Sequence, residues 1–247
     1  MAHSGASFST KRIDGAERPR RRRRRGRRLW LVLLALGLAT MIAGAALILG
    51  PLWGVWHRGQ ADASALQGWN NGGSTTLTGP PKSGASDAGK TICGSNSPDD
   101  YALVNFNDPA QYHYAGVSGD GTWELLNSRS MVHYHGTPDP GQQGNVIIAF
   151  HREPNYEHIN MLNVGSTVTV QDRACHSFVY KISGRWDIPP EKVTQLSPTN
   201  GYDMTLITCD PWWQDYNRLV WRATLVPGNG TAQSGSGQTG PVANPTF

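Results

Sequence analysis

A cysteine and an arginine flank a short segment that joins two predicted strands. Thr205–Thr208 alternates threonine with aliphatic residues, the period-two pattern of a strand, and Cys209 follows directly. Pro211 ends that strand, because proline has no N–H to donate to a sheet. Arg218 precedes a second apolar strand, Leu219–Val226. We therefore expect Cys209 and Arg218 at neighbouring strand ends, where they could act on one substrate. The alternative is a buried core thiol at Cys209.

A cysteine nucleophile needs a further group. A free thiol has a pKa of about 8.5, so it is mostly protonated at neutral pH and becomes reactive beside a cation. His151 fits this role, because it follows a turn and an apolar strand, Gly144–Phe150, and so repeats the placement of Cys209 at a strand exit. The alternative is a structural histidine, hydrogen-bonded at the strand end. The other histidines of the region expected to fold are His113, His133, His135, His158 and His176.

His133 and His135 lie on one face of a predicted strand, which is a possible metal pair. A zinc site needs three or four ligands, and no Cys-x-x-Cys or His-Glu-x-x-His motif completes this one. The acidic residues are scattered, and the sequence contains neither a phosphate-binding loop nor a dinucleotide fingerprint. We therefore expect no metal and no cofactor.

The positive charge of the chain is concentrated at its N-terminus. The formal charge is +4, from 22 basic and 18 acidic residues. Residues 1–28 hold 11 of the basic and two of the acidic residues, so the rest carries 11 basic and 16 acidic residues, a net charge of −5. A nucleic-acid-binding domain would need its positive charge on the fold, so we expect no nucleic-acid partner.

An uncharged apolar run follows the basic tail. It extends from residue 29 to residue 49, 21 residues. That is long enough to cross a hydrocarbon core of about 30 Å at about 1.5 Å per residue. Trp53 and Trp56 follow, where aromatic side chains favour the membrane interface. We assign 29–56 as a single-pass transmembrane anchor. The arginines before the span predict a cytoplasmic N-terminus and an extracellular C-terminal bulk.

A cleaved signal peptide is the alternative to this anchor. Its apolar core would run about 7 to 15 residues and end in a small-residue cleavage site. Ala43–Ala46 offers small residues, and Arg27-Arg28 before Leu29 faintly resembles a twin-arginine signal. The length of the apolar run favours the uncleaved anchor.

Composition divides the chain into five parts. Residues 1–28 form a basic, cytoplasmic and disordered tail, and 29–56 form the anchor. Residues 57–98 are rich in Gly, Ser, Asn, Thr and Ala and predict a flexible stalk. Residues 99–226 form one folded domain, and 227–247 form a disordered Gly- and Ser-rich tail.

The folded domain is predicted to be mainly β. Turn signals such as Ser118–Gly121 separate its short segments, and short helices are expected over Tyr156–Leu162 and Pro190–Val193. Closely spaced strands of this kind indicate a barrel or a sandwich. The predicted strands are Tyr101–Phe106, Val146–Phe150, Ser166–Gln171, Ser177–Ile182, Asp203–Thr208 and Leu219–Val226.

Cys93 and Cys175 are the remaining cysteines. They could pair in an oxidising compartment, which would leave Cys209 as the free thiol. Alternatively all three thiols are reduced, and we favour this because Cys93 lies in a low-complexity segment.

The motifs resemble those of the sortases, membrane-anchored cysteine transpeptidases of bacteria, chiefly Gram-positive ones. The family signature Thr-Leu-x-Thr-Cys is present as Thr205–Cys209, and Arg218-Leu219-Val220 is similar to its arginine strand. Gly144–Arg152 resembles its histidine segment, and His133–Gly141 resembles the loop before it, notably in the actinobacterial class E type. The resemblance covers roughly residues 100 to 226, in the family's order of histidine, cysteine and arginine, and implies a closed β-barrel.

Two residues raise questions within this resemblance. Phe150 stands where the family usually has glycine, and a bulky side chain there could narrow the cleft beside His151. Arg222 is a rival to Arg218 on the same strand face, but Arg218 matches the motif and lies nearer the start of the strand.

The resemblance implies a mechanism and partners. Cys209 would form an acyl-thioester with an LPxTG-like or LAxTG-like sorting signal of a secreted surface protein. His151, as imidazolium, would stabilise the thiolate and protonate the departing amine, and Arg218 would stabilise the transition state. An amine from a cell-wall precursor or a pilin would then accept the acyl group. The residues that bind the substrate are not specified by the sequence.

Two other functions are compatible with the residues. One is an extracytoplasmic cysteine protease, although papain-like enzymes place cysteine before histidine and caspases need a Gln-Ala-Cys signature that Cys209 lacks. The other is a catalytically silent sortase-like module that binds peptides, with Phe150 blocking the chemistry.

Overall fold

The computed structural model describes residues 21–71, 75–76, 91–94, 97–212 and 214–228. The chain divides into two compact units, Met1–Gly50 and Pro51–Phe247. Residues 1–20, 77–90 and 229–247, which include most of the two predicted disordered tails and much of the predicted stalk, lie outside the described residues.

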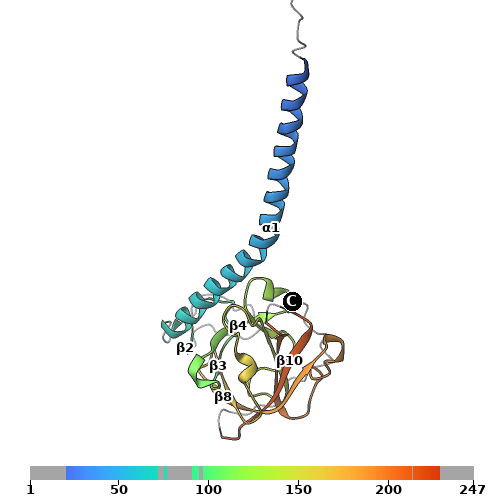
Figure 1. Cartoon of the computed structure of the whole chain (residues 1–247). Coiled ribbons are helices and arrows are strands. Elements are labelled where there is room, and N and C mark those ends of the chain that lie inside the picture. Colours follow the sequence, from blue (N-terminus) through green and yellow to red (C-terminus); the bar gives the residue numbers. More distant parts are fainter. Residues whose placement is uncertain (1–20, 72–74, 77–90, 95–96, 213, 229–247) are drawn as a thin grey trace, which may run out of the picture. The chain divides into compact units, whose positions relative to one another are not determined.

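One long helix, α1 (Arg21–Asn71), contains the predicted anchor (Figure 1). Its part from Arg27 onward is long enough and apolar enough to cross a membrane. The most apolar stretch of this part is not buried in the protein. The helix does not end with the anchor. It continues through Asn71, so the first part of the predicted flexible stalk is helical.

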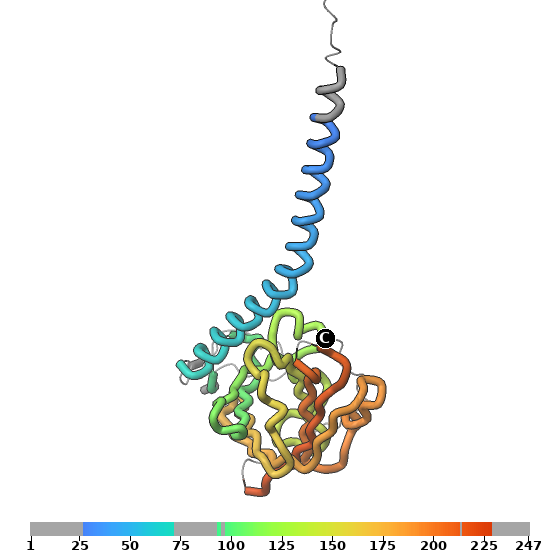
Figure 2. The backbone as a smooth tube through the Cα atoms, viewed as in Figure 1, coloured from blue at the N-terminus to red at the C-terminus, as the bar shows by residue number. Residues whose placement is uncertain are grey.

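Eight strands close into a barrel in the order β10-β8-β7-β3-β4-β5-β6-β9. The path of the backbone through this part of the chain is shown in Figure 2. Two neighbouring pairs are parallel, β4 with β5 and β6 with β9, and the other pairs are antiparallel. The strands are β3 (Ala102–Phe106), β4 (Ala115–Gly121), β5 (Met131–Tyr134), β6 (Gly144–Phe150), β7 (Thr167–Asp172), β8 (Ser177–Ile188), β9 (Tyr202–Asp210) and β10 (Asn217–Leu225). A separate pair, β1 (Thr75–Thr76) and β2 (Thr91–Ile92), precedes the barrel. The predicted closed, mainly β barrel after one apolar helix is confirmed.

The helices of the barrel are single 3-10 turns: η1 (Ala110–Tyr112), η2 (Trp123–Asn127), η3 (Ile159–Met161) and η4 (Pro190–Lys192). The helices predicted over Tyr156–Leu162 and Pro190–Val193 are therefore present only as η3 and η4. Neither segment is long enough for a stable α-helix without packing along its length.

All six predicted strands are present, and the fold differs from the prediction chiefly at β4 and in the length of β8. Ser118–Gly121, predicted as a turn, belongs to β4. The glycines of β4 serve packing, because a Cβ at Gly116 would overlap the hydroxyl oxygen of Tyr156. Strand β8 continues past Ile182 to Ile188, since a bulge opposite Arg222 and Ala223 restores the pairing with β10.

The strands bury apolar side chains on both of their faces. One cluster gathers residues from every barrel strand except β4 and fills the inside of the barrel; its largest members include Phe150, Tyr180 and Trp221. A second cluster lies on the other face of β6, β9 and β10, where Ile147, Ile207 and others pack against η2 and Leu196. Alternation along each strand explains this division, because successive side chains point to opposite faces.

Cys93 and Cys175 form a disulfide, with 5.1 Å between their Cα atoms. The expectation that all three cysteines are reduced is therefore wrong. Low complexity did not prevent pairing, because the Cys93 segment is fixed to the turn between β7 and β8, where its N–H donates to the carbonyl of Arg173 at 2.9 Å. Cys209 is the free thiol.

Candidate active site

The pairing of β9 with β10 places Cys209 beside Arg218. These two residues are direct partners in the antiparallel register, so their side chains lie on the same face of the barrel. Both are largely buried, with exposed fractions of 7% for Cys209 and 5% for Arg218. The guanidinium is held by the loop that joins the strands, because Nη1 donates to the carbonyls of Asp215 at 3.0 Å and Asn217 at 3.2 Å. The predicted juxtaposition at neighbouring strand ends is present.

The parallel pairing of β6 with β9 brings His151 to the same edge. Ala149 pairs with Ile207, so His151 and Cys209, each two residues further along, reach the same edge of the barrel. Two backbone groups hold the histidine. Its N–H donates to the carbonyl of Ser130 at 2.8 Å, and its Nε2 lies 3.0 Å from the carbonyl of Leu126. A carbonyl can only accept, so Nε2 carries a proton and Nδ1 is the basic nitrogen of the neutral ring.

Two further contacts fasten these strand exits to each other. Thr208 donates its hydroxyl to the carbonyl of Phe150. The residues that follow the histidine and the cysteine form an ion pair, in which Arg152 Nη1 donates to Asp210 Oδ1. The other end of the Arg152 guanidinium donates to the carbonyl of Glu157 and to Asn160 Oδ1. The sequence motifs did not predict this pair of Arg152 with Asp210. The available signal was their position, each directly after a proposed catalytic residue.

Burial keeps the thiol and the imidazole uncharged at rest. Desolvation raises the pKa of Cys209 to about 11, and the neighbouring Arg218 offsets only part of this effect. Desolvation and the positive charge of Arg58 lower the pKa of His151, while the carbonyl of Leu126 and the charge of Glu153 act in the opposite direction. At neutral pH the favoured pair is therefore a thiol with a neutral imidazole.

Phe150 does not narrow the approach to His151. Its side chain is fully buried inside the barrel, with its ring centroid 5.4 Å from those of both Phe106 and Tyr156. Adjacent residues of a strand point to opposite faces, so a side chain that fills the interior leaves the face of His151 clear. The expectation that Phe150 could block or reshape the cleft is wrong.

Arg222, the rival to Arg218, lies four residues further along β10 and pairs in register with Thr205. Its guanidinium donates to the carbonyl of Gln195, and it lies 4.0 Å from Asp203. Of the two arginines, only Arg218 is the strand partner of Cys209.

His133 and His135 share one carboxylate. Asp120 Oδ1 lies 2.9 Å from His133 Nδ1, and Asp120 Oδ2 lies 3.0 Å from His135 Nδ1. The second nitrogen of His133 faces the carbonyl of Pro138 at 3.1 Å. Within the described part of the chain, no group of three or more His, Cys, Asp or Glu side chains could hold a metal ion.

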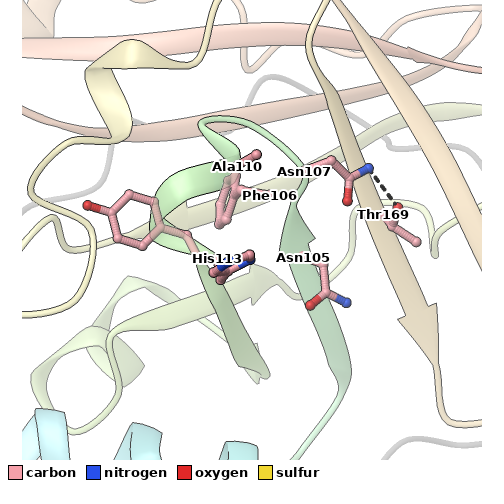
Figure 3. A pocket seen from close by; sticks show the side chains of 7 residues that line it. Asn105, Phe106, Asn107, Ala110, His113 and Thr169 are labelled. Carbon is pink, nitrogen blue, oxygen red and sulfur yellow. Dashed lines mark hydrogen bonds between the residues drawn. The ribbon is translucent and has the colours of Figure 1, made fainter.

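A cavity of about 400 Å³ lies apart from these residues, at the end of β3 (Figure 3). In Figure 3 the amide of Asn107 points to Thr169, to whose hydroxyl oxygen it donates at 3.1 Å. The lining of the cavity is polar at one side and aromatic at the other. It contains neither Cys209, His151 nor Arg218. The lining residues are Asn105, Phe106, Asn107, Ala110, His113, Tyr114 and Thr169.

Residues 109–226 match the sortase domain family model. This segment contains Cys209, His151 and Arg218 together with seven of the eight barrel strands. No curated protein sequence matches the chain.

Solved sortase structures resemble the chain. A Clostridium perfringens sortase transpeptidase is 24% identical over 52% of this chain and 80% of its own, with a TM-score of 0.46. Sortase E from Streptomyces avermitilis is 26% identical over 52% of this chain and 88% of its own, with a TM-score of 0.44. Sortase A from Corynebacterium diphtheriae, a lid mutant, is 19% identical over 51% of this chain and 69% of its own, with a TM-score of 0.44.

Proposed function

We propose that this protein is a membrane-anchored sortase, a cysteine transpeptidase in which Cys209 is the nucleophile, His151 the proton donor and acceptor, and Arg218 the transition-state stabiliser. The observation that carries the proposal is the register of the three strands. It brings a buried thiol, a guanidinium and an imidazole to one edge of the barrel, in a segment that matches the sortase domain.

The reaction starts from a minor protonation state. The proton of the Cys209 thiol moves to His151, which gives a thiolate and an imidazolium. Because burial favours the uncharged pair, only a small fraction of the protein is in this state at neutral pH. Arg218 raises that fraction, since its charge favours the thiolate.

Acyl transfer then follows in two balanced steps. The thiolate attacks the carbonyl carbon at the threonine of a sorting signal, and Arg218 stabilises the negative oxygen that forms. The C–N bond breaks, the imidazolium gives its proton to the leaving amine, and a thioester remains on Cys209. A second amine, from a cell-wall precursor or a pilin, loses its proton to His151 and displaces the thiolate.

The finer assignments are part of the same proposal. The matched motifs favour an LPxTG-like or LAxTG-like signal on secreted surface proteins and a class E-like enzyme. The arginine-rich tail before α1 favours a cytoplasmic N-terminus and an extracellular catalytic domain in a bacterial, Gram-positive membrane. The disulfide supports an extracellular catalytic domain, because disulfides persist in oxidising compartments.

The experiment that tests the function follows the fate of the acyl group. The full-length protein in detergent is incubated with LPxTG and LAxTG peptides, with and without a glycine or lysine amine, and the products are weighed. A transpeptidase gives the amine adduct. Products of hydrolysis alone, at all amine concentrations, would instead support the cysteine-protease alternative. Turnover by the Cys209→Ala protein would reject both.

A further inference from the structure

The residues of α1 that follow Pro51 pack on the barrel next to His151. Gly59 approaches the loop after His151 so closely that a Cβ there would lie 3.0 Å from Pro154 Cγ. One helical turn later, Asp62 contacts two barrel segments. Further along the same helix face, Trp69 is 5% exposed and packs on Leu103 and Val117. Gly59 and Asp62 are three residues apart and Asp62 and Trp69 are seven apart, which is the spacing of one helical stripe.

Asp62 joins the two segments on either side of the histidine. Its Oδ1 accepts from the N–H of Ser130 at 3.2 Å, and its Oδ2 accepts from Asn155 Nδ2 at 3.0 Å. Ser130 in turn accepts from the N–H of His151 at 2.8 Å. The Asp62 carboxylate therefore holds both Ser130, whose carbonyl accepts from the N–H of His151, and Asn155 in the loop that follows His151.

We propose that Asp62 is a positioning residue for His151, so that the membrane-proximal part of α1 belongs to the catalytic machinery rather than to a passive tether. This inference rests on the proposed function for the role of His151. Asp62 does not touch the reacting atoms and acts through Ser130 and Asn155.

The environment of the carboxylate supports a specific role. Desolvation raises the pKa of Asp62, and the bonds from Ser130 and Asn155 offset part of that effect. A half-buried carboxylate is costly unless donors satisfy it, and these two donors come from the segments that flank His151. The far end of the docked helix is fixed independently, because Trp69 Nε1 donates to Gln171 Oε1 at 3.0 Å. Loss of Asp62 alone should therefore leave the helix docked.

The test uses the full-length protein and two readouts. The first is the rate at which iodoacetamide alkylates Cys209, which needs no substrate and reports the thiolate fraction that His151 sustains. The second is the rate of thioester formation with an LPxTG peptide, measured against peptide concentration. We expect Asp62→Ala to slow both rates about tenfold, with the half-saturating peptide concentration unchanged within about twofold. Gln60→Ala, an exposed change on the same helix, should alter neither.

A rescue experiment separates positioning from general damage. In Asp62→Asn combined with Asn155→Asp, the amide introduced on the helix donates to the carboxylate introduced on the loop, and its oxygen still accepts from Ser130. We expect this pair to recover both rates to within about threefold of the wild-type rates. Asn155→Ala, which removes one donor, should give an intermediate loss with the thermal midpoint retained.

The outcomes are distinguishable from failure of the proposed function. Wild-type rates for Asp62→Ala in both readouts would overturn the positioning role. The positioning role would also be overturned if the Asp62→Asn, Asn155→Asp double variant unfolds at the wild-type temperature but does not recover the two rates lost in Asp62→Ala. If no peptide forms a thioester on the wild-type protein but alkylation still depends on Asp62, the proposed function fails and the positioning role stands.

Discussion

At the scale of single residues, the site contains a cation beside a thiol that burial holds neutral. The pKa of Cys209 is about 11, and it would be higher without the positive charge of Arg218. The same guanidinium is fixed by backbone carbonyls of the β9–β10 loop, so it is already oriented before substrate binds. Arg218 thus favours the thiolate at rest, and in the proposed mechanism the same charge stabilises the oxyanion.

Replacement of Arg218 by glutamine should therefore slow thioester formation about 100-fold, because it removes one fixed charge from the developing oxyanion. The measurement is the single-turnover rate of thioester formation, read by intact protein mass. Arg222→Gln is the matched control, since Arg222 lies on the same strand face but is paired with Thr205. An equal loss in the two variants would contradict the assignment.

The protonation states also predict a pH profile. The pKa of His151 is lowered and that of Cys209 is raised, so the thiolate–imidazolium fraction is small and constant between the two values. The rate should fall below the lowered pKa of His151, where the thiolate is lost, and above about pH 11, where the imidazolium is lost. A rate of thioester formation that peaks sharply between pH 6 and 8 would be incompatible with these shifts.

At the scale of elements, the site is an edge where three strands end. Local alternation in the sequence was enough to predict Cys209 and Arg218 as neighbours, because an antiparallel pair with a short loop has a register that the loop sets. The parallel pairing of β6 with β9 leaves no such local signal. His151 was therefore assigned from its strand-exit context and from the family motif, and the Arg152–Asp210 pair was missed.

Strand β4 shows a second limit of sequence patterns. Its glycines indicate a turn by composition, whereas in the fold Gly116 and Gly119 make room for Tyr156 and Leu125. Close packing from distant parts of the chain, not backbone conformation, requires glycine at these positions.

The Arg152–Asp210 pair should stabilise the edge on which the reaction depends. Arg152→Ala removes a side chain that is only 4% exposed and leaves the carboxylate of Asp210 without that partner. We expect the free energy of unfolding to fall by about 3 kcal/mol, measured by urea denaturation. The rate of thioester formation should fall about tenfold in conditions where the variant is folded. The exposed Lys181→Ala serves as control, and unchanged stability of Arg152→Ala would exclude a structural role for the pair.

At the scale of the whole molecule, the sequence correctly predicted an apolar helix followed by a mainly β barrel, because hydropathy and period-two alternation are local properties. It did not predict that the helix continues to Asn71 or that Cys93 pairs with Cys175. Both features depend on packing partners that lie far away in the sequence, the barrel surface for the helix and the β7–β8 turn for the cysteine. Low complexity in a segment is therefore a poor guide to its tertiary contacts.

The disulfide closes a loop over a sequence separation of 82 residues. Restricting the unfolded chain over this length should stabilise the fold by about 4.5 kcal/mol. The double variant Cys93→Ser and Cys175→Ser should show this loss in urea denaturation, while thioester formation by its folded fraction changes less than about threefold, because neither cysteine contacts the strand exits. A large loss of rate in the folded variant would contradict this separation of structure from chemistry.

The most direct test of the central claim is to locate the acyl-enzyme. The full-length protein is mixed with an LPxTG peptide in the absence of amine, quenched in acid and digested, and the modified residue is identified by mass. The account predicts an acyl-thioester on Cys209 that disappears when a glycine or lysine amine is added and that the Cys209→Ala protein does not form. Acylation of another residue, or turnover of the peptide by the Cys209→Ala protein, would contradict it.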